Sequence, residues 1–299
     1  MKRILLSILA IGILLLSSCG TPAAEPPATY TLSVSVNPLG AGSVSPSDGQ
    51  YEEGTQVTLT TTPASGYTFD YWGGDASGSL PTITITMDSN KSVTAYFQLI
   101  PEPEPIEFSG QGDDVSSKFT LEEGITIITM THSGESNFAI KLLDNTGGLV
   151  DLLVNEIGVF DGSVAIGVRE DNIIGAKPGI HLLDITADSS WTVLIEQPRP
   201  TSAKALPISI NGKGCGVSPF FVLDEGLTIF NMTHDGDSNF AITLLSVDGK
   251  VAELLVNEIG SYSGKKAVGV KQGNIIGARP GMHILSITAD GNWTVSISE

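Results

Sequence analysis

The stretch Asn172–Ile195, NIIGAKPGIHLLDITADSSWTVLI, decides the fold, because it returns 102 residues later as NIIGARPGMHILSITADGNWTVSI over Asn274–Ile297. Outward from this stretch, residues 108–197 match residues 210–299 at the same offset without a gap, and roughly half of the paired positions are identical. Self-similarity at a fixed offset marks an internal duplication. The sequence therefore predicts two tandem copies of one domain.

Each copy carries short runs with apolar residues at alternate positions, separated by Gly, Pro, Asp and Ser. This period of two predicts antiparallel strands joined by turns. The strands expected in the first copy, each of which recurs in the second, are Ile125–Thr131, Asn137–Leu143, Leu149–Val154, Val164–Val168, His181–Thr186 and Trp191–Ile195. Trp191, Val193 and Ile195 share one face of the last strand, which predicts a tryptophan in the core. Strands this short at such spacing predict a β-sandwich or jelly roll for each copy.

Each copy also contains the motif Pro-Gly-x-His-x-Leu-x-Ile-Thr-Ala, at residues 178–187 and 280–289. The motif is loosely similar to the Pro-Gly-x-Tyr strand opening of extracellular β-sandwich accessory domains. His181 stands on the same strand face as Leu183 and Ile185, so a packed, hydrogen-bonded imidazole is expected there.

A smaller module precedes the duplication, and its alternating runs are again separated by turn residues. Its motifs are Tyr30-Thr31-Leu32, Gly42-Ser43-Val44, Tyr51-Glu52-Glu53-Gly54-Thr55, Gly66-Tyr67-Thr68-Phe69, Tyr71-Trp72-Gly73-Gly74-Asp75, Ile85-Thr86-Met87-Asp88 and Lys91-Ser92-Val93. In these motifs residues 30–98 resemble the divergent internalin-type B-repeat of bacterial surface proteins. The resemblance implies a β-rich stalk or interaction module without catalytic residues. Trp72 is expected to fill the core of this module.

The N-terminus predicts an export signal and a lipid anchor. Lys2 and Arg3 precede an apolar run of about 13 residues, which is short for a membrane span but suits a signal peptide. The run ends in Leu16-Ser17-Ser18-Cys19-Gly20, which resembles the bacterial lipobox. The resemblance implies cleavage before Cys19 and a diacylglyceryl group on its thiol, with acyl chains such as palmitate holding the protein to a membrane.

These patterns predict an all-β chain, a small B-repeat-like β-module followed by two tandem jelly-roll-like β-sandwiches. The expected boundaries are a signal peptide at 1–18, a tether at 19–29, the B-repeat-like module at 30–98, a Pro/Glu linker at 99–107, the first sandwich at 108–197, a linker at 198–209 and the second sandwich at 210–299. Only Cys19 and Cys215 are cysteines, so no disulfide is expected if Cys19 carries lipid.

The net charge of −18 argues against nucleic-acid binding, which needs clustered Lys and Arg. It suits an exposed, well-solvated surface protein. We expect no cofactor, no metal centre and no catalytic residues, because neither a Gly-x-Ser-x-Gly elbow nor a distinct carboxylate pair is present. The chain is therefore not expected to be an enzyme.

The candidate ligand surface is the turn that follows the first long strand of each copy. It comprises His132 and Asn137 in the first copy, and His234, Asp235, Asp237 and Asn239 in the second. The Asp235-Gly236-Asp237-Ser238-Asn239 turn places oxygen ligands at alternate positions, as a calcium loop begins. It lacks the downstream glutamate of an EF-hand, so a plain polar turn is the simpler interpretation.

The sequence thus predicts a non-catalytic, lipid-anchored protein on the extracytoplasmic side of the cell envelope. Its expected role is adhesive or ligand-binding, with a polysaccharide or a surface protein as partner. Two alternatives stay open, a structural spacer without a specific ligand and an accessory subunit of an extracellular hydrolase or transporter.

Overall fold

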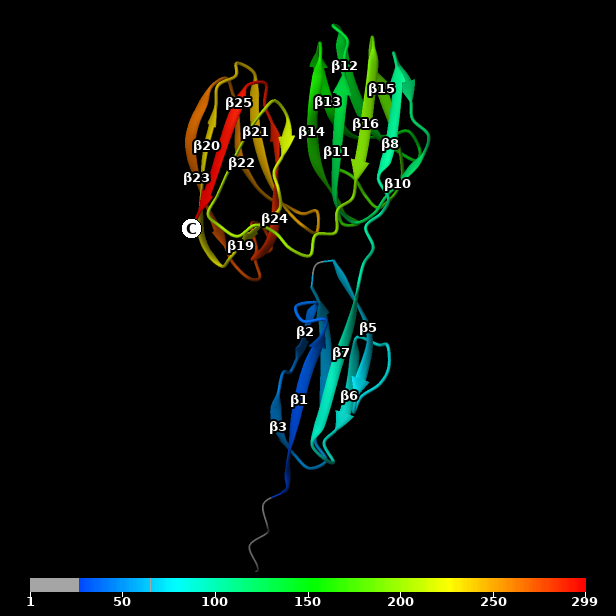
Figure 1. Cartoon of the computed structure of the whole chain (residues 1–299), viewed down its shortest axis with the longest axis vertical. Coiled ribbons are helices and arrows are strands. Elements are labelled where there is room, and N and C mark those ends of the chain that lie inside the picture. The colour runs from blue at the N-terminus through cyan, green and yellow to red at the C-terminus, as the bar shows by residue number, and fades with distance from the viewer. Residues whose placement is uncertain (1–26, 65) are drawn as a thin grey trace, which may run out of the picture.

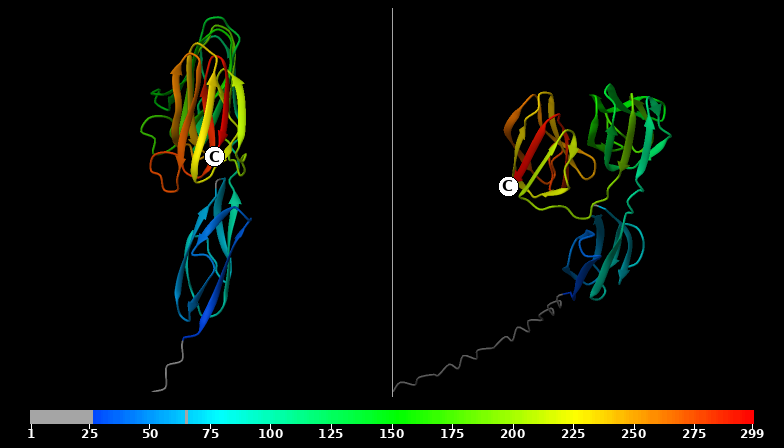
Figure 2. Two further views of the ribbon diagram at one scale, coloured as in Figure 1. Left: turned by 90° about the vertical axis from the view of Figure 1, so that its left-hand side faces the viewer. Right: turned by 45° about the horizontal axis from the view of Figure 1, so that its top comes forward.

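The computed structural model describes residues 27–64 and 66–299, and this part of the chain forms strands and turns without a helix. The predicted all-β class is confirmed. The module of residues 29–99 lies at one end of the molecule, and the two repeats lie side by side at the other (Figures 1 and 2). Cys19 and the predicted signal peptide lie outside the described residues.

The first module pairs a sheet of order β3-β1-β7-β5 with a sheet of order β2-β4-β6. Its strands are β1 (Thr29–Asn37), β2 (Gly42–Ser45), β3 (Gly49–Glu52), β4 (Gln56–Pro63), β5 (Tyr67–Gly74), β6 (Thr82–Thr86) and β7 (Lys91–Leu99). The side chain of Trp72 is 2% exposed, and its Nε1–H donates to the Leu80 carbonyl at 2.9 Å. The prediction that Trp72 fills the core is confirmed.

Each repeat is a sandwich of two antiparallel sheets, ordered β14-β11-β16-β8 and β10-β15-β12-β13 in the first, and β17-β25-β20-β23 and β18-β24-β21-β22 in the second. The short strands β9 and β19 also pair with β15 and β24. The strands of the first repeat are β8 (Ile106–Gln111), β9 (Asp114–Val115), β10 (Phe119–Leu121), β11 (Gly124–His132), β12 (Asn137–Asp144), β13 (Leu149–Ile157), β14 (Phe160–Val168), β15 (Gly179–Thr186) and β16 (Ser190–Glu196). Those of the second are β17 (Ile208–Lys213), β18 (Gly216–Val217), β19 (Phe221–Leu223), β20 (Gly226–His234), β21 (Asn239–Ser246), β22 (Val251–Ile259), β23 (Tyr262–Val270), β24 (Gly281–Thr288) and β25 (Asn292–Ser298).

The two sandwich cores are built alike, because the alternating residues of both sheets point inward. Trp191 and Trp293 are buried, as their strand pattern predicts. Each indole Nε1–H donates to a backbone carbonyl, that of Gly112 at 2.9 Å and that of Gly214 at 2.8 Å. His181 is also buried, and its Nδ1 lies 3.0 Å from the Gly179 carbonyl, so the packed imidazole predicted there is confirmed.

Arg199, in the linker between the repeats, contacts the preceding linker and the first repeat. Its backbone N–H donates to the Glu102 carboxylate at 3.0 Å, and its guanidinium lies 3.0 Å from the Glu122 carboxylate. The linker turns back across the ends of both sandwiches, so the second repeat packs beside the first (Figure 1). This packing creates a surface that neither repeat has alone.

Candidate functional site

The two repeats contact each other through different surfaces. Strand β14 of the first repeat packs against strands β18 and β24 of the second. The centre of the contact is the buried set Ile125, Ala165, Leu245 and Ile284, flanked by Ile127, Val217 and Phe220. Burial of this apolar surface stabilises the contact between the two repeats by roughly 25 cal/mol for each Å² removed from water.

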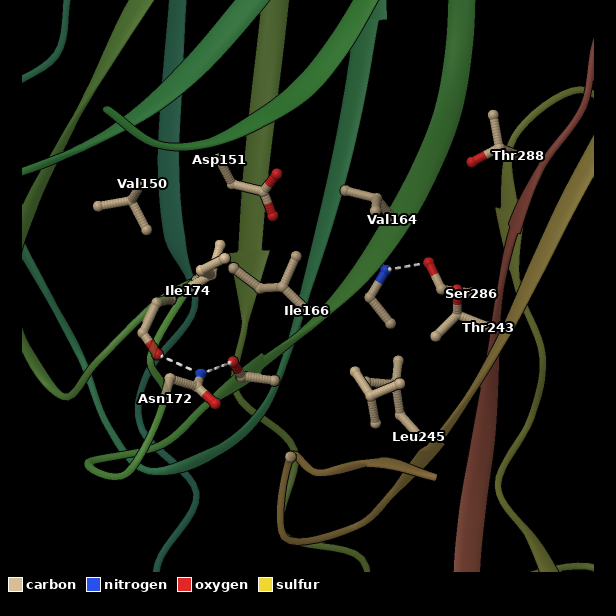
Figure 3. A pocket seen from close by; sticks show the side chains of 16 residues that line it. Val150, Asp151, Val164, Ile166, Asn172, Ile174, Thr243, Leu245, Ser286 and Thr288 are labelled. Atoms are coloured by element: carbon tan, nitrogen blue, oxygen red, sulfur yellow. Dashed lines mark hydrogen bonds between the residues drawn. The ribbon is translucent and has the colours of Figure 1, made fainter. Parts of the chain in front are cut away.

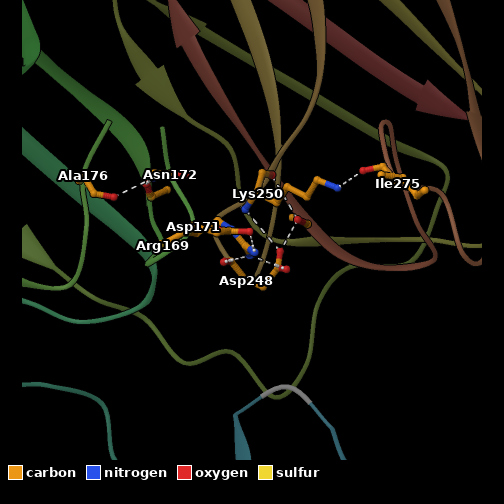
Figure 4. Close-up of polar contacts among 9 residues, drawn as sticks. Arg169, Asp171, Asn172, Ala176, Asp248, Lys250 and Ile275 are labelled. Carbon is orange, nitrogen blue, oxygen red and sulfur yellow. Dashed lines mark hydrogen bonds and ion pairs between the residues drawn. The ribbon is translucent and has the colours of Figure 1, made fainter. Parts of the chain in front are cut away.

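Polar contacts fix the register of this interface. The Ser286 hydroxyl accepts a hydrogen bond from the Ala165 N–H at 3.0 Å. At one end of the interface, Arg169 donates to both the backbone carbonyl and the carboxylate of Asp248, at 3.0 and 2.8 Å (Figure 4). Asp171 holds the same guanidinium at 2.8 Å. Hydrogen bonds and charge from Asp171, together with Asp248, raise the pKa of Arg169, which stays protonated.

The two copies differ at several of the positions where they meet. Ser286 and Thr243 of the second repeat face the first repeat, but the corresponding positions of the first repeat, on its outward face, are Asp184 and Lys141, an ion pair at 3.0 Å. Likewise, Val164 of the first repeat faces the second, and its counterpart on the free edge is Lys266. Charged residues on the two free surfaces disfavour the addition of a third repeat or of another chain by the same contact.

A cleft opens beside this interface, with a volume of about 350 Å³. One wall comes from β13, β14 and the loop after β14, and the other from β21, β24 and the turn after β21 (Figure 3). Its apolar lining includes Val150, Val164, Ile166, Ile174, Leu245 and Val251, and its polar lining includes Asp151, Asn172, Thr243, Ser286 and Thr288. Mixed lining in a cleft between domains is typical of ligand sites.

Two of the lining polar groups are occupied within the protein. The Asn172 amide donates to the carbonyls of Gly167 and Ala176, at 3.0 and 2.7 Å, and so shapes the loop that follows β14. The Ser286 hydroxyl binds the first repeat, as described above. Asp151, Thr243 and Thr288 are left to face the cleft (Figure 3).

Asp151 is the charged group of the cleft. Burial raises the pKa of its carboxyl, and a hydrogen bond from the Leu152 N–H at 2.8 Å opposes that rise. Within residues 27–64 and 66–299, no Lys, Arg or His forms an ion pair with it. A carboxyl with a raised pKa inside a cleft is characteristic of functional sites.

We expect Asp151→Asn to stabilise the protein at neutral pH. The pKa of Asp151 in the folded state lies above its ordinary value of 3.8, so the folded state holds the proton more tightly. Stability is therefore lost as the pH rises from 3.8 through the folded pKa, and asparagine removes that loss. Urea unfolding at pH 7 and pH 3.5 measures the free energy of unfolding of both proteins. Asp151→Asn should be more stable than the unchanged protein at pH 7 and almost equally stable at pH 3.5. A loss of stability at pH 7 would show that the carboxylate has a stabilising partner.

The residues predicted as a ligand surface lie away from the cleft, at and just beyond the C-terminal ends of strands β11 and β20. His132 and His234 are 2% and 4% exposed, and their rings stack on Phe138 and Phe240 with centroids 4.6 Å apart. Each Nδ1 lies within hydrogen-bond reach of a glycine carbonyl, at 2.8 and 3.0 Å. Each Nε2 faces a carboxylate oxygen, Asp188 at 3.0 Å and Asp290 at 3.1 Å. Both imidazoles are therefore held beneath the turns.

The remaining predicted residues are exposed. Asn137 and Asn239 begin strands β12 and β21, and the Asp237 N–H donates to Asp290 at 3.0 Å. Asp235 accepts hydrogen bonds from the side chain and the backbone of Asn292, which lower the pKa of its carboxyl. In the described part of the chain no group of three His, Cys, Asp or Glu side chains is placed to hold a metal ion. The ligand surface on these turns stays a prediction.

No helix long and apolar enough to cross a membrane occurs in residues 27–64 and 66–299. The described part of the chain thus contains no helical span.

Comparison with known proteins gives a family match for the first module. No curated protein matches the chain. Among solved structures, a conserved Pseudomonas aeruginosa protein of unknown function shares 11% identity over 65% of this chain and 79% of its own, with a TM-score of 0.19. Residues 32–101 match the family model of the divergent InlB B-repeat domain, which confirms the resemblance predicted for residues 30–98.

Proposed function

We propose that this protein is a non-catalytic, lipid-anchored cell-surface protein that binds a ligand in the cleft between its two repeats. The cleft is the observation that carries the proposal, because it exists only through the pairing of the repeats. Its 350 Å³ volume and its mixed lining suit a small ligand or the side chain of a larger one.

The other modules support a place on the cell surface. B-repeat domains are typical of extracellular and surface proteins, and residues 32–101 match that family. A lipid on Cys19 would hold the short tether at the membrane. The B-repeat-like module would then stand between the membrane and the paired repeats, which lie at its far end (Figure 1).

The exposed residues of the repeats favour a protein partner over a polysaccharide. The large hydrophobic side chains exposed on the two sandwiches are aliphatic, among them Ile157, Ile173 and Ile174 with their counterparts Ile259, Ile275 and Ile276. No Phe, Tyr or Trp is exposed in the described repeats. The described repeats therefore offer no fully exposed aromatic ring for stacking on a flat ligand, and Phe108, Phe220 and Tyr262 are half-buried.

A structural spacer is the second candidate, favoured by the charged free surfaces that stop the repeats from extending. A spacer needs rigid pairing of the repeats but no contact in the cleft. Binding to cell-envelope material therefore separates the two candidates.

The test uses residues 20–299, which include every described strand, and isolated cell-envelope fractions. We expect saturable retention that falls at least tenfold with Thr288→Trp, because the indole fills the cleft. Thr186→Trp is the matched control, since Thr186 is the counterpart of Thr288 on the free face of the first repeat. Equal retention of both variants would place binding outside the cleft, and no retention of folded protein would favour the spacer.

A further inference from the structure

The second repeat shows how this fold satisfies a carboxylate at the position of Asp151. Its counterpart there is Glu253, whose carboxylate lies 3.0 Å from the Nζ of Lys266. Glu253 is on β22 and Lys266 is on β23, so the ion pair bridges the open seam between the two sheets of that sandwich. The pair is a built-in example of an alkylammonium group bound at this position.

The first repeat has a carboxylate, Asp151, at the position of Glu253, but no basic side chain at the position of Lys266. Val164 stands where Lys266 stands in the second repeat, and both Val164 and Asp151 line the cleft. The neighbouring basic side chains are engaged elsewhere, Lys141 with Asp184 at 3.0 Å and Arg169 with Asp248 at 2.8 Å. The seam that an ion pair closes in the second repeat therefore stays open in the first, and it forms part of the cleft.

We propose that the cleft between the repeats binds an alkylammonium group, such as a lysine side chain of a partner, with Asp151 as the carboxylate that receives it. This inference rests on the proposed ligand-binding role of the cleft and names its ligand class. The bound ammonium takes the place that the Lys266 Nζ holds beside Glu253.

The walls of the cleft suit the rest of such a side chain. Val150, Val164 and Ile166 offer apolar surface for a chain of methylene groups, as buried lysine stems require. An ammonium has three N–H donors, and the Asp151 carboxylate accepts from them, while Thr243 and Thr288 line the opposite wall of the cleft (Figure 3). Burial, which raises the pKa of Asp151, is the cost that a bound cation offsets.

The sharpest test follows backbone amide NMR shifts of residues 20–299 during titration with N-acetyl-lysine methylamide. N-acetyl-norleucine methylamide is the control ligand, since it has a similar stem without the ammonium. We expect saturable shifts at cleft residues with the lysine compound and at least tenfold weaker binding of the norleucine compound. Cadaverine in a parallel titration distinguishes a free diamine from a lysine held in a peptide.

Two variants and a matched control complete the test. Asp151→Asn is expected to weaken binding at least tenfold, and Glu253→Gln in the second repeat to leave it within twofold. Val164→Lys is expected to rebuild the ion pair of the second repeat within the first and to abolish binding while the protein stays folded.

Lysine binding that is equal in wild type and Asp151→Asn would overturn the inference, as would the absence of shifts in the cleft. A separate outcome distinguishes the ligand class from the proposed binding role of the cleft. If Thr288→Trp abolishes retention on envelope fractions while lysine compounds do not bind, the cleft binds a ligand of another class.

Discussion

Replacing Gly167 with valine is expected to separate the two repeats, whereas the same replacement at Gly269 leaves the protein unchanged. Gly167 lies on β14 against the turn of the second repeat, and a Cβ there would overlap the Gly249 carbonyl oxygen. The opposing atom belongs to the backbone, so no rotamer change relieves the overlap. Gly269 is the counterpart of Gly167, and a Cβ built on it meets nothing within 4 Å.

The separation exposes Leu245 and Ile284, now 2% and 1% exposed. Burial of one such side chain contributes about 1.5–3 kcal/mol, so the loss of contact exceeds what the Arg169–Asp248 ion pair alone restores. Small-angle scattering should show a larger radius of gyration, and protease should cut the linker between the repeats at least tenfold faster. Valine suits a strand, so circular dichroism should keep its β signature in both variants. Scattering curves that coincide for Gly167→Val and Gly269→Val would contradict the proposed interface.

The strands and the core of each repeat follow from the sequence because their cause is local. A period of two identifies the buried face of a strand, and Trp191 and His181 lie where it predicts. The same rule applied to β11 places His132 on the buried face with Ile128 and Met130. His132 and His234, the counterpart histidines at the ends of β11 and β20, follow the same alternation, which indicates core packing and not an exposed ligand.

The pairing of the repeats has no such local signal. A sheet face that meets another domain and a sheet face in water can carry the same alternation, so the sequence of one copy cannot tell them apart. The signal is in the differences between the copies. At two pairs of counterpart positions, the interface has an uncharged residue and the free surface has a charged one. These pairs are Val164 with Lys266, and Ser286 with Asp184. Identity between the copies does not carry this signal, since Gly167 and Gly269 are the same residue and only Gly167 lies at the interface.

Replacing Trp293 with alanine is expected to cost the second repeat about 3–5 kcal/mol, the range for a large aromatic removed from a core. The ring is 6% exposed and lies directly over Gly212, where a Cβ would overlap the indole. Its Nε1–H also holds the Gly214 carbonyl at 2.8 Å. The variant therefore leaves a cavity and an unpaired carbonyl in one step, and urea unfolding should show a clearly lower midpoint.

Two further variants separate these contributions. Trp293→Phe keeps much of the packing and loses the hydrogen bond, so it should cost less than alanine, with about 1–3 kcal/mol from the unpaired carbonyl. Gly212→Ala keeps the indole, but the added methyl group overlaps it. This overpacking should lower the free energy of unfolding by about 1–3 kcal/mol. If Gly212→Ala were neutral, the indole would have room to move, and the close contact between β17 and the ring would not define this core.

Because Leu245 and Ile284 belong to the second repeat, its unfolding also uncovers the interface and the cleft beside it. Loss of ligand binding should therefore follow the unfolding of the second repeat, even though Asp151 lies on the first.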